Sequence, residues 1–363
     1  MADSCISMAL SDFYNIYSNN SVRLVLHTID SGGDAVGAAS AALYLMKERK
    51  VQAIIGPQQS EQAKFVINLG EKAQVNATAS IFEAYGWKEV VLIYEDTEYG
   101  NGLVHYFSDA FQQINVLIPY RCVIPLTATD DQILEKLYKL MTMKTRVFLV
   151  HMTTSIGSRL FNNARNARMM DHGYAWITTS GLSSLLDHID SHAIDSMQGV
   201  LGVQPYIQSS KQLEDFNLRW KRKFLSKKPH SEITEPSLFG IWAYDTVWVL
   251  AMAIERVGTL NPHFLSFKSS GENAFTDLSN LGYSEMGPKF RKTIRSTRLK
   301  GGLSGDLNLI TGQRKPSAFQ ILNVIGKQRV IGFWTAAKGL SQNLNATDKS
   351  MYSASADDLE TPI

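Results

Sequence analysis

Short runs of apolar residues alternate with longer amphipathic stretches along most of this chain, and this alternation constrains the fold more than any other feature. The runs have the length and the content of Val, Ile, Leu and aromatic residues typical of buried strands. Strands that alternate with helices form βαβ units, which assemble into a mostly parallel sheet covered by helices. The predicted strands are Val22–Ile29, Val51–Ile55, Glu89–Tyr94, Arg146–His151, Tyr174–Thr178, Gly199–Val203, Ala318–Val324 and Val330–Trp334.

Apolar residues at spacings of three and four predict the helices between these strands. In the clearest case, Gly33–Lys50, the apolar residues share one face and the last turn is basic, which suits the negative end of a helix. A helix over Asp3–Tyr17 is predicted at the beginning of the chain. The other predicted helices are Ser60–Lys72, Gly102–Ile114, Asp131–Met141, Ser155–Met169, Lys211–Phe224, Pro236–Arg256 and Pro288–Thr297.

One part of the chain breaks the alternation. A strand should follow the helix Ser60–Lys72, but only Ala73–Ala79 separate this helix from a second, short one. Ser80 and Glu83 have the spacing of a capping box and are predicted to begin that short helix. The polar residues in between do not suit a buried strand. The sequence therefore predicts that one βα step is missing, and an irregular connection in an ordinary mixed fold is the alternative.

Length and charge narrow the class of protein. At roughly 150 residues per domain, 363 residues suggest about two domains. Thirty-six Lys and Arg oppose 34 Asp and Glu, and a net charge of +2 gives no overall field to attract nucleic acid.

The most apolar stretch, Leu238–Ile254, carries Asp245 at its centre and is shorter than the about 20 residues that span a bilayer, so a buried core helix is predicted. No signal peptide is recognisable, and Cys5 and Cys122 are expected to be free thiols.

No pattern in the sequence predicts an enzyme or a metal site. Neither of the common glycine-rich phosphate-binding motifs occurs. Ser304 lies among three glycines, but Asp306 stands where a nucleophile elbow needs glycine, so this segment is interpreted as a tight turn. His188 and His192 have the spacing to share a helix face, but the glutamate of a zinc-binding HExxH motif is missing. No cofactor is expected.

Two clusters of charged residues are interpreted as solvated surface rather than as a catalytic, cation-binding or nucleic-acid-binding site. Glu95, Asp96 and Glu98 follow a predicted strand and could act as paired carboxylates or bind a divalent cation, but a solvated loop explains them as well. A basic run near the middle of the chain contains Trp220 and Phe224, four residues apart. This spacing predicts a buried stripe beneath a solvated cationic face rather than a site for nucleic acid.

Loops that follow the strands predict a ligand crevice. In open α/β sheets, small molecules bind beyond the carboxyl ends of the strands. Short polar residues in such loops can bind the carboxylate or amino group of an amino acid through hydrogen bonds and helix N-termini, and loop capping is the alternative. These residues are Gly56, Pro57 and Ser60 after one strand, Thr97, Tyr99 and Gly100 after another, and Thr179, Ser180 and Gly181 after a third.

Several longer strings are specific enough to indicate a family. Tyr85–Leu103 (YGWKEVVLIYEDTEYGNGL) is similar to the opening of the second lobe in the amino-terminal domain of plant glutamate receptor-like proteins. The resemblance covers nearly the whole chain. The other strings that carry it are Val51–Pro57, Tyr120–Ile133, Lys144–Met152, Phe239–Glu255 and Gly332–Leu340.

The resemblance implies an α/β, type I periplasmic-binding-protein-like fold, with parallel sheets flanked by helices in two lobes joined by three crossings. It places lobe one at 1–78 and 207–298 and lobe two at 79–206 and 299–340. The tail at 341–363 is poor in large apolar residues and is expected to be disordered. The family's signal peptide and first strand are not recognisable here. Asn76–Ala79 stand where the family has a strand, a Ser- and Thr-rich loop and the first crossing, so that crossing is expected to be partly deleted.

The resemblance also implies a function. It indicates the extracellular ligand-binding and assembly domain of a ligand-gated cation channel subunit at the plasma membrane, with the pore outside this chain. The expected partners are a small amino acid or peptide and other receptor subunits in a homo- or hetero-oligomer, and not nucleic acid. At matching positions the ligand-binding candidates are Gly56, Pro57, Tyr99, Thr179 and Ser180, with Tyr99 over the ligand.

The sequence also carries possible glycosylation sites and allows a second function. Sequons at Asn19, Asn76 and Asn345 permit glycosylation in the secretory pathway. The alternative to ligand binding is a subunit-interaction module, which forms dimers through apolar helices of lobe one and has an empty cleft. An α/β enzyme is disfavoured because no nucleophile or metal constellation is recognisable.

Overall fold

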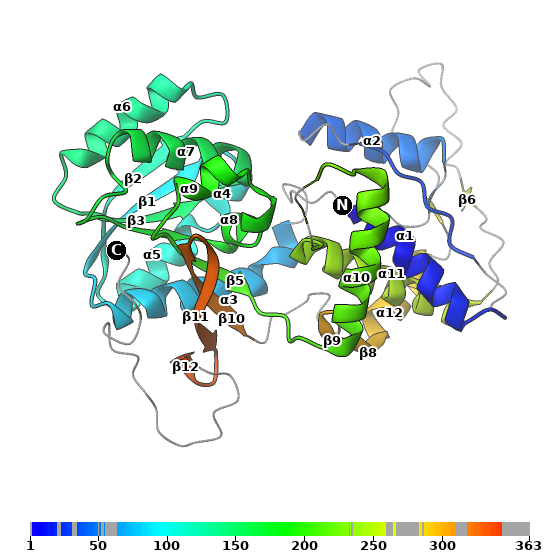
Figure 1. Cartoon of the computed structure of the whole chain (residues 1–363). Helices are drawn as coiled ribbons and strands as arrows, with labels where there is room; N and C mark the ends of the chain where they lie inside the picture. The colour runs from blue at the N-terminus through cyan, green and yellow to red at the C-terminus, as the bar shows by residue number, and fades with distance from the viewer. Residues whose placement is uncertain are drawn as a thin grey trace, which may run out of the picture. The chain divides into compact units, whose positions relative to one another are not determined.

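The chain folds into two units, shown in a computed structural model in which most helices and strands are labelled (Figure 1). Unit 1 consists of Met1–Ala63 and Ile207–Arg314, and unit 2 of Lys64–Tyr206 and Lys315–Ile363. The structure describes residues 2–19, 23–30, 35–49, 51, 54, 64–231, 233, 235–258, 264–265, 283–284, 287–308 and 318–342.

Unit 2 is built on a sheet with a parallel centre. Over the described residues the sheet has eight strands in the order β12-β11-β10-β5-β4-β3-β1-β2. The strands from β5 to β2 run parallel, and β10, β11 and β12 pair antiparallel at the other side. These strands are β1 (Glu89–Glu95), β2 (Leu117–Ile124), β3 (Val147–His151), β4 (Ala175–Thr178), β5 (Leu201–Pro205), β10 (Phe319–Ile325), β11 (Lys327–Thr335) and β12 (Gly339–Ser341).

Helices cover both faces of this sheet, which explains why its central strands are continuously apolar. In β1, Val91 and Ile93 pack toward α6 (Asp130–Met141) and α7 (Thr154–Asn166) on one face. Val90 and Leu92 pack toward α3 (Lys64–Ala84) and α5 (Val104–Gln113) on the other (Figure 1). Unit 2 is therefore a three-layer α/β unit, as the alternating pattern predicts for this part of the chain.

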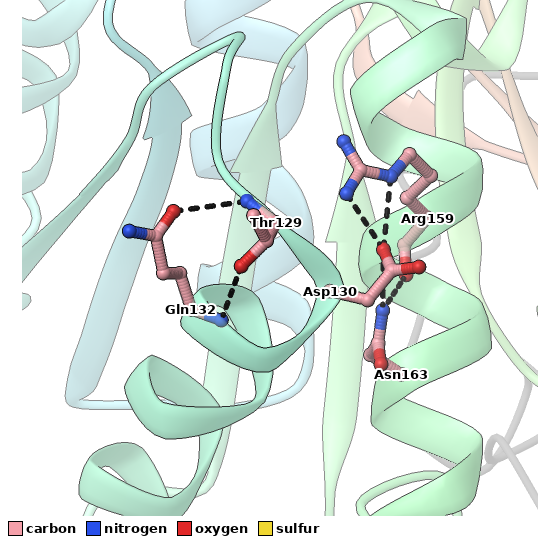
Figure 2. Close-up of polar contacts among 5 residues, drawn as sticks. All are labelled: Thr129, Asp130, Gln132, Arg159 and Asn163. Atoms are coloured by element: carbon pink, nitrogen blue, oxygen red, sulfur yellow. Dashed lines mark hydrogen bonds and ion pairs between the residues drawn. The ribbon is translucent and has the colours of Figure 1, made fainter.

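Polar contacts fix the beginning of α6 and join it to α7. Thr129 and Gln132 form the capping box: the Gln132 N–H donates to Thr129 Oγ1 (3.3 Å), and the Thr129 N–H donates to Gln132 Oε1 (2.9 Å). Figure 2 shows Asp130 facing α7, where its Oδ1 accepts from Arg159 Nε (2.9 Å) and from Asn163 Nδ2 (3.3 Å). Because Asp130 lies in the first turn, it also opposes the positive end of the helix dipole.

Unit 1 is mainly helical in its described part. Its helices are α1 (Ala2–Ile16), α2 (Ala35–Lys47), α10 (Lys211–Lys227), α11 (Leu238–Val257) and α12 (Gly287–Ser296). A shared core joins α1, α10 and α11 and contains the stacked rings of Trp220 and Phe224, as their spacing predicts. Arg219 lies beside them and forms a double hydrogen bond with Asp12 of α1 (2.7 and 2.9 Å), so one cation of the basic run is paired within the unit. Short strand pairs are β6 (Phe264–Leu265) with β7 (Tyr283–Ser284), and β8 (Arg298–Gly302) with β9 (Gly305–Asn308).

Buried Asp245 explains the tight turn predicted around Ser304. Its carboxylate accepts hydrogen bonds from the Leu303 N–H (2.8 Å), the Ser304 N–H (3.0 Å) and the Ser304 hydroxyl. Gly302 lies so close that a Cβ there would meet Asp245 Oδ1 at 2.9 Å. The turn therefore belongs to the hairpin β8–β9, and Asp245 of α11 binds it through these hydrogen bonds.

Helix α11 is, among the described residues, the one helix long and apolar enough to cross a membrane. Its buried residues include Asp245, Val247 and Ala251, and it packs against α1 and α12, which agrees with the predicted core helix. Cys5 in unit 1 and Cys122 in unit 2 are both buried free thiols, as expected. Burial raises the pKa of the Cys5 thiol to about 11, which keeps it protonated and unreactive at neutral pH.

Helix α3 corrects the prediction of two helices with a connection between them. It runs without interruption from Lys64 to Ala84. The Ser80 hydroxyl donates to the Asn76 carbonyl (3.0 Å), one turn earlier, instead of capping a new helix. Continuing the helix buries Val75, Ile81 and Phe82 in the core of unit 2, so tertiary packing outweighs the local capping signal.

The predicted strand Val22–Ile29 is also wrong, because residues 23–30 form no strand. The Leu24 N–H donates to the Tyr14 hydroxyl of α1 (2.7 Å), and the Thr28 hydroxyl reaches Asp3 (3.3 Å). No neighbouring strand pairs with this segment among the described residues, and Val25 is 75% exposed. A parallel sheet is thus described in unit 2 but not in the described part of unit 1; the predicted strand Val51–Ile55 lies mostly outside those residues.

The unit boundaries differ from the predicted lobes at two of the three crossings. Residues 64–78 belong to unit 2 because they are part of the continuous helix α3, and residues 299–314 belong to unit 1, where Asp245 binds the β8–β9 turn. The third division between the units falls between 206 and 207. Strand β2 was not among the predicted strands, and most of the predicted tail 341–363 lies outside the described residues.

Candidate functional site

Three of the predicted ligand-binding residues gather at one edge of the unit 2 sheet. Strands β1, β3 and β4 are adjacent and parallel, so their carboxyl ends meet at the same edge. Tyr99 lies in α4 (Glu98–Gly102), just after β1. Thr179 follows β4, and Ser180 begins the short helix α8 (Ser180–Ser183).

His151, the last residue of β3, links Tyr99 to Thr179. Its Nε2 lies 3.0 Å from the Tyr99 carbonyl oxygen, and its Nδ1 lies 2.8 Å from Thr179 Oγ1. Because a carbonyl oxygen can only accept, Nε2 carries the proton and Nδ1 accepts from the Thr179 hydroxyl. Complete burial lowers the pKa of His151 to about 4, so the ring is neutral at physiological pH and makes both bonds.

The Tyr99 side chain lies over His151 and over the beginning of α8. The two rings are 4.4 Å apart at their centroids, and Tyr99 is half-buried. A Cβ added to Gly181 would fall 1.7 Å from the Tyr99 hydroxyl oxygen, so glycine at 181 leaves the space that the phenol fills. Half-buried Tyr99 and half-buried Ser180 thus both lie at this edge, whereas Thr179 is fully buried.

A buried carboxylate, Glu95, organises the loop that carries Tyr99. Glu95 is 2% exposed and accepts from the Thr153 N–H and hydroxyl (both 2.7 Å) and from the Thr97 hydroxyl (2.9 Å). Thr97 in turn accepts from the Gly100 N–H (3.0 Å) and so caps α4. The Glu95 carboxylate also sits at the N-terminus of α7, where a negative charge is favoured. This corrects the interpretation of Glu95 as a solvated loop residue, whereas Asp96 and Glu98 are exposed as that interpretation expects.

Ser180 meets a side chain from α3. Its backbone N–H donates to Gln74 Oε1 (3.3 Å), and its hydroxyl donates to the same oxygen. Gln74 is buried, and residues on either side of it in α3 belong to the core of unit 2. Gln74, Glu95 and His151 were absent from the predicted ligand-binding residues, although His151 could have been found because it ends a strand beside β1 and β4.

Gly100 offers a test of how tightly the Tyr99 loop is built. A Cβ there would lie 1.9 Å from the Glu95 carbonyl oxygen, and this backbone cannot shift cheaply at the end of β1. We expect Gly100→Ala to lower the free energy of unfolding of unit 2 by about 1–3 kcal/mol in chemical denaturation. The control is Gly102→Ala in the same helix, where nothing lies within 4 Å and alanine should leave stability equal or higher. Equal stability of the two variants would contradict this account of the loop.

His151 predicts a pH dependence of stability. Its pKa is about 4 in the folded protein and about 6.5 in an unfolded chain, so only the unfolded chain binds a proton between these values. The contribution of neutral His151 is therefore present above pH 6.5 and is lost as pH falls toward 4, at up to about 1.4 kcal/mol per pH unit. Urea unfolding at pH 6.5 and pH 5.5 should show a smaller loss in His151→Gln than in the original chain. The same loss in both would show that His151 does not titrate in this way.

The remaining sequence candidates fall outside this edge. Gly56, Pro57 and Asn345 lie outside the described residues. Asn19 is exposed in a turn after α1, and Asn76 is exposed on α3 with Thr78 of its sequon buried. His188 and His192 lie in separate short helices, η1 (Leu186–His188) and α9 (Ser191–Asp195). Across the described part of the chain, no three His, Cys, Asp or Glu side chains are placed to hold a metal ion.

Comparison with known proteins identifies the family. The family model described as receptor family ligand binding region matches residues 1–76 and 71–327, which is most of the chain. The chain belongs to this receptor ligand-binding family. The match consists of two pieces that share residues 71–76, so the break coincides with the point where the sequence predicts a missing step. The mixed α/β architecture of unit 2, with its largely parallel sheet, agrees with this membership.

Similar proteins are plant receptors. The chain is 41% identical to glutamate receptor 2.2 of Arabidopsis thaliana over 96% of its own length and 40% of the relative. It is 40% identical to glutamate receptor 2.7 of the same plant over 96% of this chain and 39% of the relative. It is 38% identical to glutamate receptor 2.1 over 99% of this chain and 42% of the relative. The chain thus spans about two fifths of these relatives, which are receptors by name rather than enzymes. The first alignment extends over 379 positions, more than the 363 residues here, so that relative has residues this chain lacks within the matched region.

Proposed function

We propose that this chain is the non-catalytic ligand-binding part of a glutamate receptor-like channel subunit, and that it holds a small amino-acid-type ligand between two lobes. In the full-length receptor this part would lie on the extracellular side of the plasma membrane, ahead of the pore, and associate with other subunits. Membership of the receptor ligand-binding family and the names of the relatives support this proposal.

The observation that carries the proposal is the convergence of Tyr99, Thr179 and Ser180 at the carboxyl edge of the unit 2 sheet. The half-buried ring of Tyr99 lies near the hydroxyl and backbone N–H of half-buried Ser180, a combination suited to a small molecule with both apolar and polar parts. Thr179 is fully buried and supports this edge through its bond to His151. His151 and Glu95 hold these groups in place from within the unit.

Isothermal titration calorimetry tests the proposal. The purified chain is titrated with each of the standard amino acids, and at least one should release or absorb heat with saturation. Tyr99→Ala and Ser180→Ala should weaken that binding roughly tenfold or more, which corresponds to about 1.4 kcal/mol. Tyr138→Ala, on the exposed side of α6, should leave it unchanged. If the amino acid binds Tyr99→Ala and Ser180→Ala as tightly as the original chain, the assignment of the site is wrong.

A second candidate function is subunit association, which exposed apolar side chains in unit 1 favour. Large apolar residues are exposed on α2 and on the segment 23–30: Val25, Leu26, Ile29, Leu43, Tyr44 and Met46. Clustered exposed apolar residues often mark surfaces that bind another protein. Light scattering distinguishes the two functions, because a stable dimer in a chain that binds no amino acid supports the interaction module, whereas a monomer that binds one supports the ligand-binding function alone.

A further inference from the structure

Gln74 occupies the hydrogen-bonding groups that Ser180 would offer to a ligand. The N–H and the hydroxyl of Ser180 both donate to Gln74 Oε1, so one oxygen of the protein receives two bonds. A carboxylate or carbonyl oxygen of a small ligand would seek the same two donors. Ser180 is only half-buried, so its donors lie within reach of solvent and of a ligand when Gln74 moves away.

The position of Gln74 is fixed by the helix that carries it. Val75, Ala77 and Thr78 follow it in α3 and are all buried, and the Thr78 hydroxyl donates to the Gln74 carbonyl oxygen (2.9 Å). Helix α3 therefore cannot turn Gln74 away from Ser180 without losing core contacts of unit 2, and only the side chain is able to move.

This contact depends on the continuous helix in this chain. Gln74 lies within residues 71–76, where the two pieces of the family match meet, and α3 runs through that join. Because the whole of α3 belongs to unit 2, it brings a side chain from the join against Ser180 of the same unit. The contact is thus a consequence of the same local feature that the sequence shows as a missing βα step.

We propose that the side-chain oxygen of Gln74 stands in for a ligand oxygen at Ser180 and must be displaced before a carboxylate binds there. This proposal rests on the ligand-binding function proposed above. A charged carboxylate makes stronger hydrogen bonds than a neutral amide oxygen, so displacement is possible. Its cost lowers the apparent affinity, because only the fraction of molecules with Ser180 open is competent to bind.

Removing the Gln74 oxygen should therefore tighten binding. In Gln74→Leu, which keeps the size of the side chain, we expect the standard amino acid that binds best to bind roughly tenfold more tightly than in the original chain, as expected for two lost competing hydrogen bonds. Gln74→Ala, a second variant with no polar group, should show the same direction. The matched control is Gln198→Leu, which removes a glutamine oxygen that accepts from the Gly326 N–H (2.7 Å) in the same unit.

The gain must depend on Ser180. In a double-mutant cycle, the advantage of Gln74→Leu should disappear in the Ser180→Ala background, whereas a general loosening of unit 2 would persist there. Thermal unfolding of each variant shows which of them are folded. Tighter binding in a folded Gln74 variant, including binding found only in that variant, supports the proposal when the gain is absent in the Ser180→Ala background, and a gain that persists in that background overturns it.

The negative outcomes distinguish a failure of the role of Gln74 from a failure of the proposed ligand-binding function. If the original chain and the folded Gln74 variants bind an amino acid equally, the ligand-binding function stands and the role of Gln74 is wrong. If neither binds any amino acid even with the Ser180 donors released, the ligand-binding function is wrong and the role of Gln74 falls with it.

Discussion

Replacing Glu95 with alanine is expected to lower the free energy of unfolding of unit 2 by about 2–4 kcal/mol and to abolish amino acid binding with it. The buried carboxylate accepts from the Thr153 N–H, the Thr153 hydroxyl and the Thr97 hydroxyl. Alanine leaves these donors without their acceptor and removes the negative charge beside the N-terminus of α7. Since Thr97 caps the helix that carries Tyr99, the loop should lose its defined position.

Hydrogen exchange measures this effect within unit 2. The amides of β1 and β3 should exchange faster in Glu95→Ala than in the original chain by a factor that reflects the lost free energy. Asp96→Ala is the control, because Asp96 is the exposed neighbour in the same loop and its removal should cost little. Equal protection of the two variants would mean that Glu95 does not organise the edge.

Replacing Asp245 with alanine should have an effect of similar size in unit 1, about 3 kcal/mol. The side chain is fully buried in α11 and receives hydrogen bonds from the backbone of Leu303 and Ser304 and from the Ser304 hydroxyl. Alanine would leave buried N–H groups unpaired and release the β8–β9 hairpin from the helix. The amides of α11 and of the hairpin should lose protection while those of unit 2 keep it.

Asp306, in strand β9 of the hairpin that Asp245 binds, provides the control for Asp245. Asp306 Oδ1 accepts one hydrogen bond, from the Gly301 N–H (2.8 Å), and that bond is exposed to solvent. Asp306→Ala should cost no more than about 1 kcal/mol. If Asp245→Ala is no worse than Asp306→Ala, burial of the carboxylate does not determine the strength of this contact.

The fold of unit 2 is largely predictable from the sequence, because its core strands are short, apolar and flanked by helices. Strands β1, β3 and β4 lie within a residue or two of their predicted positions. Strand β2 is the exception. Its burial alternates along its first half and it contains Pro119 and Arg121, so it lacks the continuous apolar pattern of the central strands.

Predictions failed where tertiary contacts outweigh local signals. Ser80 and Glu83 have capping-box spacing, yet burial of Ile81 and Phe82 favours a continuous α3. Residues 23–30 have the composition of a strand, but a strand requires a neighbour to pair with, and a single sequence does not show whether that neighbour is in place.

The candidate site was predictable in part for the same reason. Tyr99, Thr179 and Ser180 follow strands, and the rule that ligands bind at the carboxyl edge finds them. Gln74 and Glu95 act through contacts with residues distant in the chain, 106 and 58 positions away respectively. No local spacing reveals such pairs.

Hydrogen exchange of the full chain, with and without the amino acid that binds best, tests the central claim most directly. If Tyr99, Thr179 and Ser180 form the ligand surface, amides in residues 95–101 and 179–184 should gain protection at saturation, while the exposed surface of α6 stays unchanged. Protection confined to other segments, with these two unaffected, would place the ligand elsewhere and contradict the account.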